Sequence, residues 1–184
     1  MITSLIKRIA RQLDVGRIPY MIIGGQAVLL YGRPRLTRDI DITLGVDTNQ
    51  YVRIEQLCRD LNLRPLLEDS RDFTIRTKVL PAEDPESRIR VDFIFSFTPY
   101  ETQAMERTNK VFLDDCVVRF ASCEDVIIHK MVAARPIDVE DVRHMIARNK
   151  EELDLSYLRH WLAEFGSLPE HTTVLADFEK LLEQ

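Results

Sequence analysis

The stretch YMIIGGQAVLLYGRPRLTRDIDITL, Tyr20–Leu44, decides the fold. It runs from an apolar strand pattern through Gly24-Gly25 into a short helix pattern, and then into a second strand pattern. Glycines at such a junction let the backbone approach a ligand, and the N–H groups at a helix start favour an anion such as phosphate. A glycine pair alone more often marks a tight turn, so the meaning of this pair depends on its surroundings.

Two aspartates stand in the second strand pattern, Asp39-Ile40-Asp41-Ile42-Thr43-Leu44. Alternation with a period of two places Asp39 and Asp41 on one face of the strand and the apolar residues on the other. Two like charges on one face repel each other unless a hard cation such as Mg2+ lies between them. Taken alone, this pattern also fits a solvated edge strand.

A third carboxylate weakens the edge-strand alternative. In RIRVDFIFSF, residues 88–97, the odd positions are apolar and are predicted to face a core, which puts Asp92 on the opposite face together with Arg90. A neighbouring position in the sheet brings Asp92 beside Asp39 and Asp41. Three carboxylates on one face hold two metal ions about 3.5–4 Å apart in enzymes that carry out in-line displacement at phosphorus. The prediction is a site for two Mg2+ (or Mn2+) ions.

These elements together resemble the nucleotidyltransferase superfamily with the DNA polymerase β-like fold. Its signature is hG[GS], a spacer, Dh[DE]h and a later h[DE]h, matched here by Ile23–Gly25, Asp39–Ile42 and Val91–Phe93. The resemblance implies that Asp39, Asp41 and Asp92 are catalytic metal ligands and that Gly24 and Gly25 seat a nucleoside triphosphate. Gly25 replaces the Ser that is common at the second position, which removes one hydroxyl group and leaves more of the phosphate contact to backbone N–H groups.

Downstream, CEDVIIHKMVAARPIDVEDVRHMI, residues 123–146, resembles the helical part of AbiEii-like minimal nucleotidyltransferases, many of which are toxins of bacterial toxin–antitoxin systems. Lys130 lies on the apolar stripe of one predicted helix, and Asp138 and Asp141 lie on that of the next. Lys130 therefore meets an aspartate between the helices or points with it at a cleft. A buried ion pair and a role of Lys130 and Asp141 in nucleotide binding and catalysis carry equal weight.

Several arginines and one lysine are candidates for contacts with phosphate. Arg38 precedes Asp39 directly and is best placed to bind triphosphate oxygens bidentately, whereas Arg33 and Arg35 fit a solvated loop equally well. The turn-forming segment Pro81–Ser87 joins two strand patterns, so residues 73–97 are predicted to form one long hairpin. Its charged residues form a candidate basic strip for an anionic acceptor, although ordinary exposed charges explain them better: Arg76, Lys78, Arg88 and Arg90.

The order of patterns predicts an α/β (α+β) fold with a mixed sheet flanked by helices. Strands are expected at residues 20–23, 40–44, 73–80 and 89–97, and helices at residues 3–15, 26–31 and 49–61. After Ser122 the patterns are helical only. We therefore expect a catalytic core over residues 1–120 and a C-terminal helical region over residues 121–184 that closes the cleft.

Composition limits the function classes. The chain of 184 residues is 45% hydrophobic and carries a net charge of -5, which suits a globular protein and argues against coating nucleic acid by bulk charge. Basic residues interrupt the apolar positions of residues 1–16, which predicts an amphipathic helix rather than a signal peptide or membrane span. The three cysteines form no CxxC pair, and no zinc, Walker A, GxSxG or GxGxxG pattern is present. A cytoplasmic location is expected.

The predicted function is metal-dependent transfer of a nucleoside monophosphate from a nucleoside triphosphate to a hydroxyl group. An RNA 3′ end such as that of tRNA is the favoured acceptor, and a cognate antitoxin protein is an expected partner. One alternative is modification of a small molecule such as an antibiotic. Another is a catalytically silent binding partner in a toxin–antitoxin pair, against which the three intact carboxylates argue.

Overall fold

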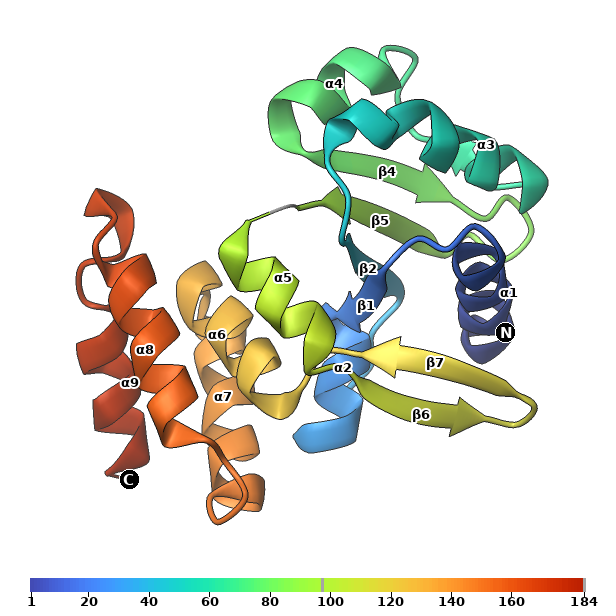
Figure 1. Ribbon diagram of the computed structural model, residues 1–184. Helices are drawn as coiled ribbons and strands as arrows, with labels where there is room; N and C mark the ends of the chain where they lie inside the picture. The colour runs from blue at the N-terminus through green and yellow to red at the C-terminus, as the bar shows by residue number, and fades with distance from the viewer. Residues whose placement is uncertain (97, 184) are drawn as a thin grey trace. The chain divides into compact units, whose positions relative to one another are not determined.

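The protein is described by a computed structural model that covers residues 1–96 and 98–183 (Figure 1). The chain forms two compact units. The sheet unit comprises Met1–Gln26 and Leu36–Ala121, and the helical unit comprises Ala27–Arg35 and Ser122–Gln184. The chain therefore passes between the units more than once, and each unit is described by itself.

A seven-stranded sheet forms the centre of the sheet unit, with strand order β3-β4-β5-β2-β1-β7-β6. The pairs β2–β5 and β1–β7 are parallel, and the other neighbouring strands are antiparallel. The predicted mixed α/β fold is thus confirmed. The strands are β1 Tyr20–Ile23, β2 Asp39–Leu44, β3 Arg64–Pro65, β4 Val79–Glu83, β5 Arg90–Phe95, β6 Asn109–Leu113 and β7 Cys116–Phe120.

Helices pack along this sheet. Figure 1 shows α3 and α4 beside β4 and β5, and α1 beside β7. The helix α2 begins in the sheet unit and ends in the helical unit. The helices concerned are α1 Ile2–Val15, α2 Gly24–Tyr31, α3 Tyr51–Asp60, α4 Ser70–Thr77 and α5 Pro99–Glu106, with a 3-10 turn, η1, at Thr48–Gln50.

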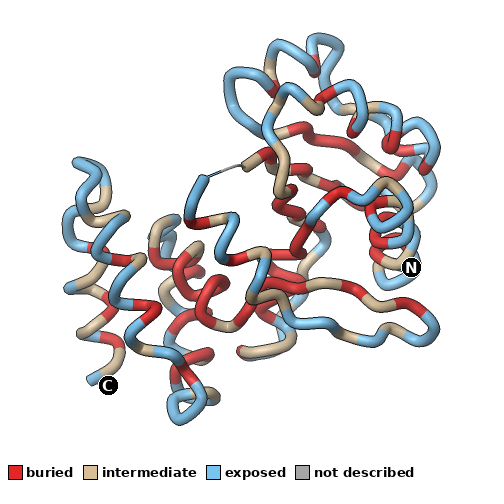
Figure 2. The backbone as a smooth tube through the Cα atoms, viewed as in Figure 1, coloured by how far each residue is buried: buried red, intermediate tan, exposed pale blue. Residues whose placement is uncertain are grey.

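Strand alternation builds the core as predicted. Ile40 and Ile42 of β2 and Val91 and Phe93 of β5 are at most 1% exposed, and Figure 2 shows buried positions running along the central strands. The charged residues between them lie on the other face. Phe97, which ends the predicted strand, lies outside the described residues.

The predicted long hairpin is partly wrong. Residues Ser70–Thr77 form α4, which ends at Lys78 in a left-handed conformation with φ 62°. Thr74 Oγ1 donates to the Ser70 carbonyl at 2.7 Å, a bond that is typical of a helical turn. The hairpin consists only of β4 and β5, and Pro81 lies within β4, where its carbonyl accepts from the Leu66 N–H at 2.9 Å.

The second stretch of the helical unit contains only helices among its described residues, in agreement with the sequence pattern after Ser122. Ser122 caps α6 by accepting from the Asp125 N–H at 3.1 Å, and Pro136 stands in the first turn of α7, where its missing N–H costs nothing. The elements are α6 Cys123–Ala133, α7 Pro136–Asn149, α8 Leu155–Gly166, α9 Val174–Leu182 and the 3-10 turn η2 Pro169–His171.

The short stretch Ala27–Arg35 is fastened to α7. Arg148 donates to the Gly32 carbonyl at 3.1 Å, and Asn149 donates to the Tyr31 carbonyl at 2.8 Å. No helix in the described part of the chain combines the length and the apolar character needed to cross a membrane.

Candidate active site

The strand register brings the three predicted carboxylates to one face of the sheet. Asp41 on β2 is the direct partner of Asp92 on β5, and Asp39 is the partner of Arg90. Neighbouring strands lie about 4.8 Å apart, and residues paired across them project to the same face. Asp39, Asp41 and Asp92 together, the carboxylate set, thus occupy three corners of a four-residue arrangement, and Arg90 occupies the fourth.

Arg90 supplies the counter-charge of this arrangement. Its Nε donates to Asp92 Oδ1 at 2.8 Å. This hydrogen bond, together with the negative charges of Asp92, Asp39 and Asp41, raises the pKa of Arg90 against the opposing effect of burial. The sequence predicted Arg90 on the same face as Asp92 and as a candidate contact for the acceptor, and its hydrogen bond to Asp92 is a finding of the structure.

The spacing of the carboxylates bears on metal binding. Within residues 1–96 and 98–183, no three His, Cys, Asp or Glu side chains lie close enough together to hold a metal ion as they stand. Like charges on one face repel each other, and Asp92 Oδ1 accepts the hydrogen bond from Arg90. The carboxylate set still fits hard divalent cations, because it offers only oxygen ligands on adjacent strands.

Gly24 is required where it stands. It has φ +61°, a conformation that side chains disfavour, and a Cβ atom there would lie 2.8 Å from Asp41 Cγ and closer still to Oδ2. The Asp41 carboxylate therefore lies directly against the backbone at the start of α2. The predicted phosphate seat and one predicted metal ligand are adjacent.

Two residues near this junction escaped sequence reasoning. Gln26 is 7% exposed, and its Nε2 donates to the Asp39 carbonyl at 3.4 Å, which ties α2 to the start of β2. Thr37 packs its side chain against Gly25. Neither residue belongs to a recognisable motif. The one sequence feature that could have pointed to Thr37 is that Gly25 lacks the hydroxyl group of the Ser that is common at this position.

The arginines between Gly25 and Asp39 separate into two kinds. Arg33 and Arg38 are exposed. Arg35 forms a bidentate pair with Asp141, from Nε to Oδ1 at 3.2 Å and from NH2 to Oδ2 at 3.1 Å. Arg38, next to Asp39, thus remains the predicted triphosphate contact of this segment, whereas Arg35 serves the helical unit.

Lys130 lies in a buried ion-pair cluster of the helical unit. Its Nζ is 2.6 Å from Asp138 Oδ1 and 2.9 Å from Asp141 Oδ2, and the three side chains are between 0% and 6% exposed. Arg135 also donates to Asp138, at 2.5 and 3.1 Å. Burial raises the pKa of Asp138, but the hydrogen bonds from Arg135 and Lys130 outweigh it and leave that pKa below its usual value. A role of Lys130 or Asp141 in nucleotide binding stays a prediction.

The candidate basic strip is not a single surface of unpaired charges. Lys78 pairs with Asp47 at 3.1 Å and Arg88 with Glu83 at 3.0 Å, in addition to the Arg90 pair. Arg76 belongs to α4 rather than to a strand. These pairs favour the ordinary explanation of the hairpin charges.

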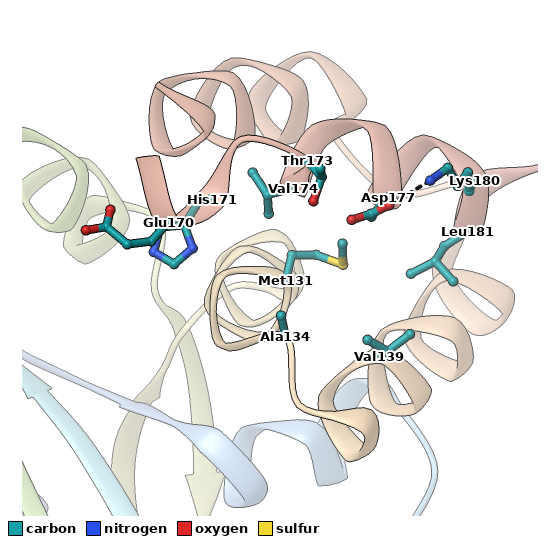
Figure 3. Close-up of a pocket in the computed structure, with 10 residues that line it drawn as sticks. All are labelled: Met131, Ala134, Val139, Glu170, His171, Thr173, Val174, Asp177, Lys180 and Leu181. Carbon is teal, nitrogen blue, oxygen red and sulfur yellow. Dashed lines mark hydrogen bonds and ion pairs between the residues drawn. The ribbon is translucent and has the colours of Figure 1, made fainter. Parts of the chain in front are cut away.

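A separate cavity of about 360 Å3 lies in the helical unit (Figure 3). Met131, Val139 and Val174 are among its apolar lining residues, and Glu170 and His171 of the η2 turn also line it. The residues that line it include none of the predicted site residues. We therefore place the candidate active site at the carboxylate set.

Comparisons with solved structures agree with this fold. The antibiotic-resistance factor ANT(2'')-Ia in solution matches with a TM-score of 0.64 and 19% sequence identity, covering 92% of this chain and 96% of that chain. Its crystal structure with adenylyl-2''-tobramycin gives 0.61 and 21%, covering 90% and 97%. A nucleotidyltransferase-like protein from Paracoccidioides brasiliensis gives 0.55 and 16%, covering 95% and 92%. No curated protein sequence matches the chain.

A family model settles the membership of the chain. The model described as "Nucleotidyl transferase AbiEii toxin, Type IV TA system" matches residues 16–177. This range contains the carboxylate set, the glycine pair and the Lys130 cluster. The chain is a nucleotidyltransferase and belongs to the AbiEii toxin family of type IV toxin–antitoxin systems.

Proposed function

We propose that the protein transfers a nucleoside monophosphate from a nucleoside triphosphate to a hydroxyl group at an RNA 3′ end, such as that of tRNA, and that it acts as the toxin of a toxin–antitoxin pair. The single observation that carries the chemistry is the register of β2 and β5, which aligns Asp41 with Asp92 and places Asp39 on the same face. The family supplies the toxin context.

Divalent metal is part of this proposal. Asp39 and Asp41 would hold both of two Mg2+ or Mn2+ ions, and Asp92 would bind one of them. Such ions, when bound, neutralise the negative charge of the triphosphate and of the displaced pyrophosphate. The fit rests on three oxygen-donor side chains of adjacent strands and on the guanidinium of Arg90, which shows that the set attracts positive charge.

The remaining chemistry falls to the chain itself. The hydroxyl oxygen of the acceptor forms a bond to the α-phosphorus, the bond from that phosphorus to the bridging oxygen breaks, and pyrophosphate leaves. Asp92 would accept the proton of the hydroxyl, and what supports this role is that only its Oδ1 is used in the hydrogen bond to Arg90. Backbone N–H groups at Gly24 and Gly25 hold the phosphates.

Residues outside the carboxylate set complete the nucleotide site. Arg38 is an exposed cation one residue from Asp39 and suits a bidentate contact with phosphate oxygens. The proposal also includes Lys130 and Asp141. What supports them is a buried ammonium group held by two carboxylates, an expensive arrangement that functional sites often contain.

A small-molecule acceptor is the second candidate. The structure of ANT(2'')-Ia with an adenylylated aminoglycoside has the same fold as this chain. Its 21% identity supports a shared fold and leaves the acceptor open. A catalytically silent role fits less well, because all three carboxylates are present.

The acceptor is tested by following the label. The protein is incubated with Mg2+ and each α-labelled ribonucleoside triphosphate. Separate reactions contain total cell RNA, total cell protein or an aminoglycoside as the acceptor. Asp41→Asn serves as the inactive control. Label on RNA supports the proposal. Label on protein or on the aminoglycoside would show that this molecule, and not RNA, is the acceptor, and no label in any reaction would overturn the transfer activity. Co-expression with the neighbouring gene tests the antitoxin.

A further inference from the structure

The starting observation is the close packing of Thr37 on Gly25. Gly24 is the only glycine with positive φ among the described residues, so the backbone of Gly25 does not itself require glycine. Space does require it: a Cβ atom at position 25 would lie 2.9 Å from Thr37 Cβ and closer still to Thr37 Oγ1. The side chain of Thr37 thus fills the place of a side chain at position 25.

The hydroxyl of Thr37 is available for a ligand. Thr37 is half-buried, and its hydroxyl makes no hydrogen bond to any other described residue. It stands two residues before Asp39 and over the first turn of α2, beside the glycine that contacts the Asp41 carboxylate. A neutral hydroxyl here can donate to an anionic oxygen without adding to the negative charge of the carboxylate set.

We propose that Thr37 Oγ1 donates a hydrogen bond to a phosphate oxygen of the bound nucleoside triphosphate. Gly25 and Thr37 then act together: Thr37 supplies the hydroxyl group, and the absence of a side chain at position 25 leaves space for it. This inference rests on the proposed function, because it assigns a further contact to the same nucleotide site.

Removal of the hydroxyl is the first test. Thr37→Val keeps the shape and deletes the donor, whereas Thr37→Ser keeps the donor. Hydrogen bonds to charged groups support about a tenfold change in affinity or more, so Thr37→Val is expected to bind triphosphate at least about tenfold more weakly. Thr37→Ser should bind within about threefold of the wild type. Affinities are measured by calorimetry with Mg2+, using whichever of the four ribonucleoside triphosphates the wild type binds most tightly.

A matched control exists on the same strand region. Thr43 of β2 is 1% exposed, and its Oγ1 has no hydrogen-bond partner among the described residues. Thr43→Val deletes an equivalent hydroxyl, and triphosphate affinity should not change. A second readout is the affinity for Mn2+ without nucleotide, which Thr37→Val should also leave unchanged. A purely structural role of Thr37 would instead lower both affinities together.

Moving the hydroxyl is the decisive test. Gly25→Ser alone should clash with Thr37 and lower both the melting temperature and the triphosphate affinity. The double variant Gly25→Ser/Thr37→Ala removes the clash and returns a hydroxyl to position 25, so it should recover most of the affinity that Thr37→Ala alone loses. Equal affinities of the double variant and Thr37→Ala would contradict the prediction that a hydroxyl group at position 25 can replace the hydroxyl group of Thr37.

The failure of this inference differs from failure of the proposed function. If the wild type binds triphosphate and Thr37→Val binds it equally well, the contact is wrong and the proposed function stands. If the wild type binds none of the four triphosphates with Mg2+, the proposed function is wrong and this inference falls with it.

Discussion

Asp41 and Asp92 are direct register partners on the adjacent parallel strands β2 and β5. Two carboxylates in this relationship repel each other, and one nearby positive charge is that of Arg90, which donates a hydrogen bond to Asp92. A divalent cation that binds these carboxylates would therefore compete with the Arg90 guanidinium group.

Triphosphate binding should depend on divalent metal. Without a cation, the carboxylate set faces the negative phosphates, so we expect the nucleoside triphosphate to bind only weakly in the presence of a chelator and markedly better with Mg2+ or Mn2+. Calorimetric titration in both conditions measures this difference. Equal affinities would contradict the metal site.

Each of the substitutions Asp39→Asn, Asp41→Asn and Asp92→Asn should abolish most of the transfer activity. A metal ion stabilises transition-state charge by several kcal/mol, and each ~1.4 kcal/mol is a factor of ten, so we expect kcat/KM to fall about a thousandfold or more. The fold should persist in chelator, because removal of a repelling charge costs no packing. Asp47→Asn, which alters an exposed aspartate paired with Lys78, is the control. A variant with near-normal turnover would remove its residue from the site.

Arg90→Gln should separate stability from metal affinity. Loss of the counter-charge leaves the carboxylates unbalanced, so we expect the melting temperature in chelator to fall by roughly 2–4 °C, which corresponds to about 1 kcal/mol for a chain of this size. The affinity for Mn2+ should rise severalfold, because the cation no longer competes with a guanidinium group. Arg88→Gln, which breaks an exposed pair with Glu83, should leave the Mn2+ affinity unchanged. Weaker Mn2+ binding by Arg90→Gln would show that Arg90 instead supports the site.

Lys130→Met tests the buried cluster. Loss of the sole partner of a buried ion costs about 3–5 kcal/mol, but here Asp138 keeps Arg135 and Asp141 keeps Arg35. We therefore expect the free energy of unfolding to fall by less than that amount. Denaturant unfolding measures the loss, and Lys180→Met, which breaks an exposed pair with Asp177, is the control. A drop in triphosphate affinity beyond the loss of folded protein would support a role of Lys130 in nucleotide binding, and unchanged affinity would leave it structural.

The stability contributed by Asp138 should disappear in acid. Its pKa in the folded protein lies below the usual value of 3.8, so its ion pairs stabilise the fold fully above that pH and lose their effect as the pH falls through the lowered pKa. The difference in unfolding free energy between the wild type and Asp138→Asn should be largest near neutral pH and shrink below about pH 4. Urea unfolding at several pH values measures it. A difference that stays constant down to pH 3 would contradict the lowered pKa.

The sheet core and the alignment of the carboxylates were accessible from the sequence for a simple reason. The alternation in β2 and β5 assigns each residue to a face, and Asp41 and Asp92 had to share the polar face once the strands were neighbours. Residues 73–77 contain β-branched residues that predicted a strand, but they lie in α4, where Thr74 Oγ1 donates to the Ser70 carbonyl within a helical turn. The hairpin of β6 and β7 was not predicted.

Contacts that depend on the path of the chain were out of reach. Nothing in the pattern of Arg90 distinguishes a solvent-facing hairpin charge from the counter-charge of Asp92. The packing of Thr37 on Gly25 joins residues on either side of a loop, and the position of that loop is set by the fold as a whole. The Lys130 cluster was predictable in part. Helical spacing placed Lys130, Asp138 and Asp141 on the apolar stripes of two helices, but it did not show which side chains form ion pairs.

The discontinuity of the helical unit bears on how such a gene can evolve. Residues Ala27–Arg35 belong to the same compact unit as Ser122–Gln184, and Arg35 supplies one of the ion pairs of Asp141. A single recombination breakpoint near residue 121 would give the incoming helices the Arg35 of another lineage. The two units are therefore expected to be inherited together, with Arg35 and Asp141 changing as a pair rather than independently.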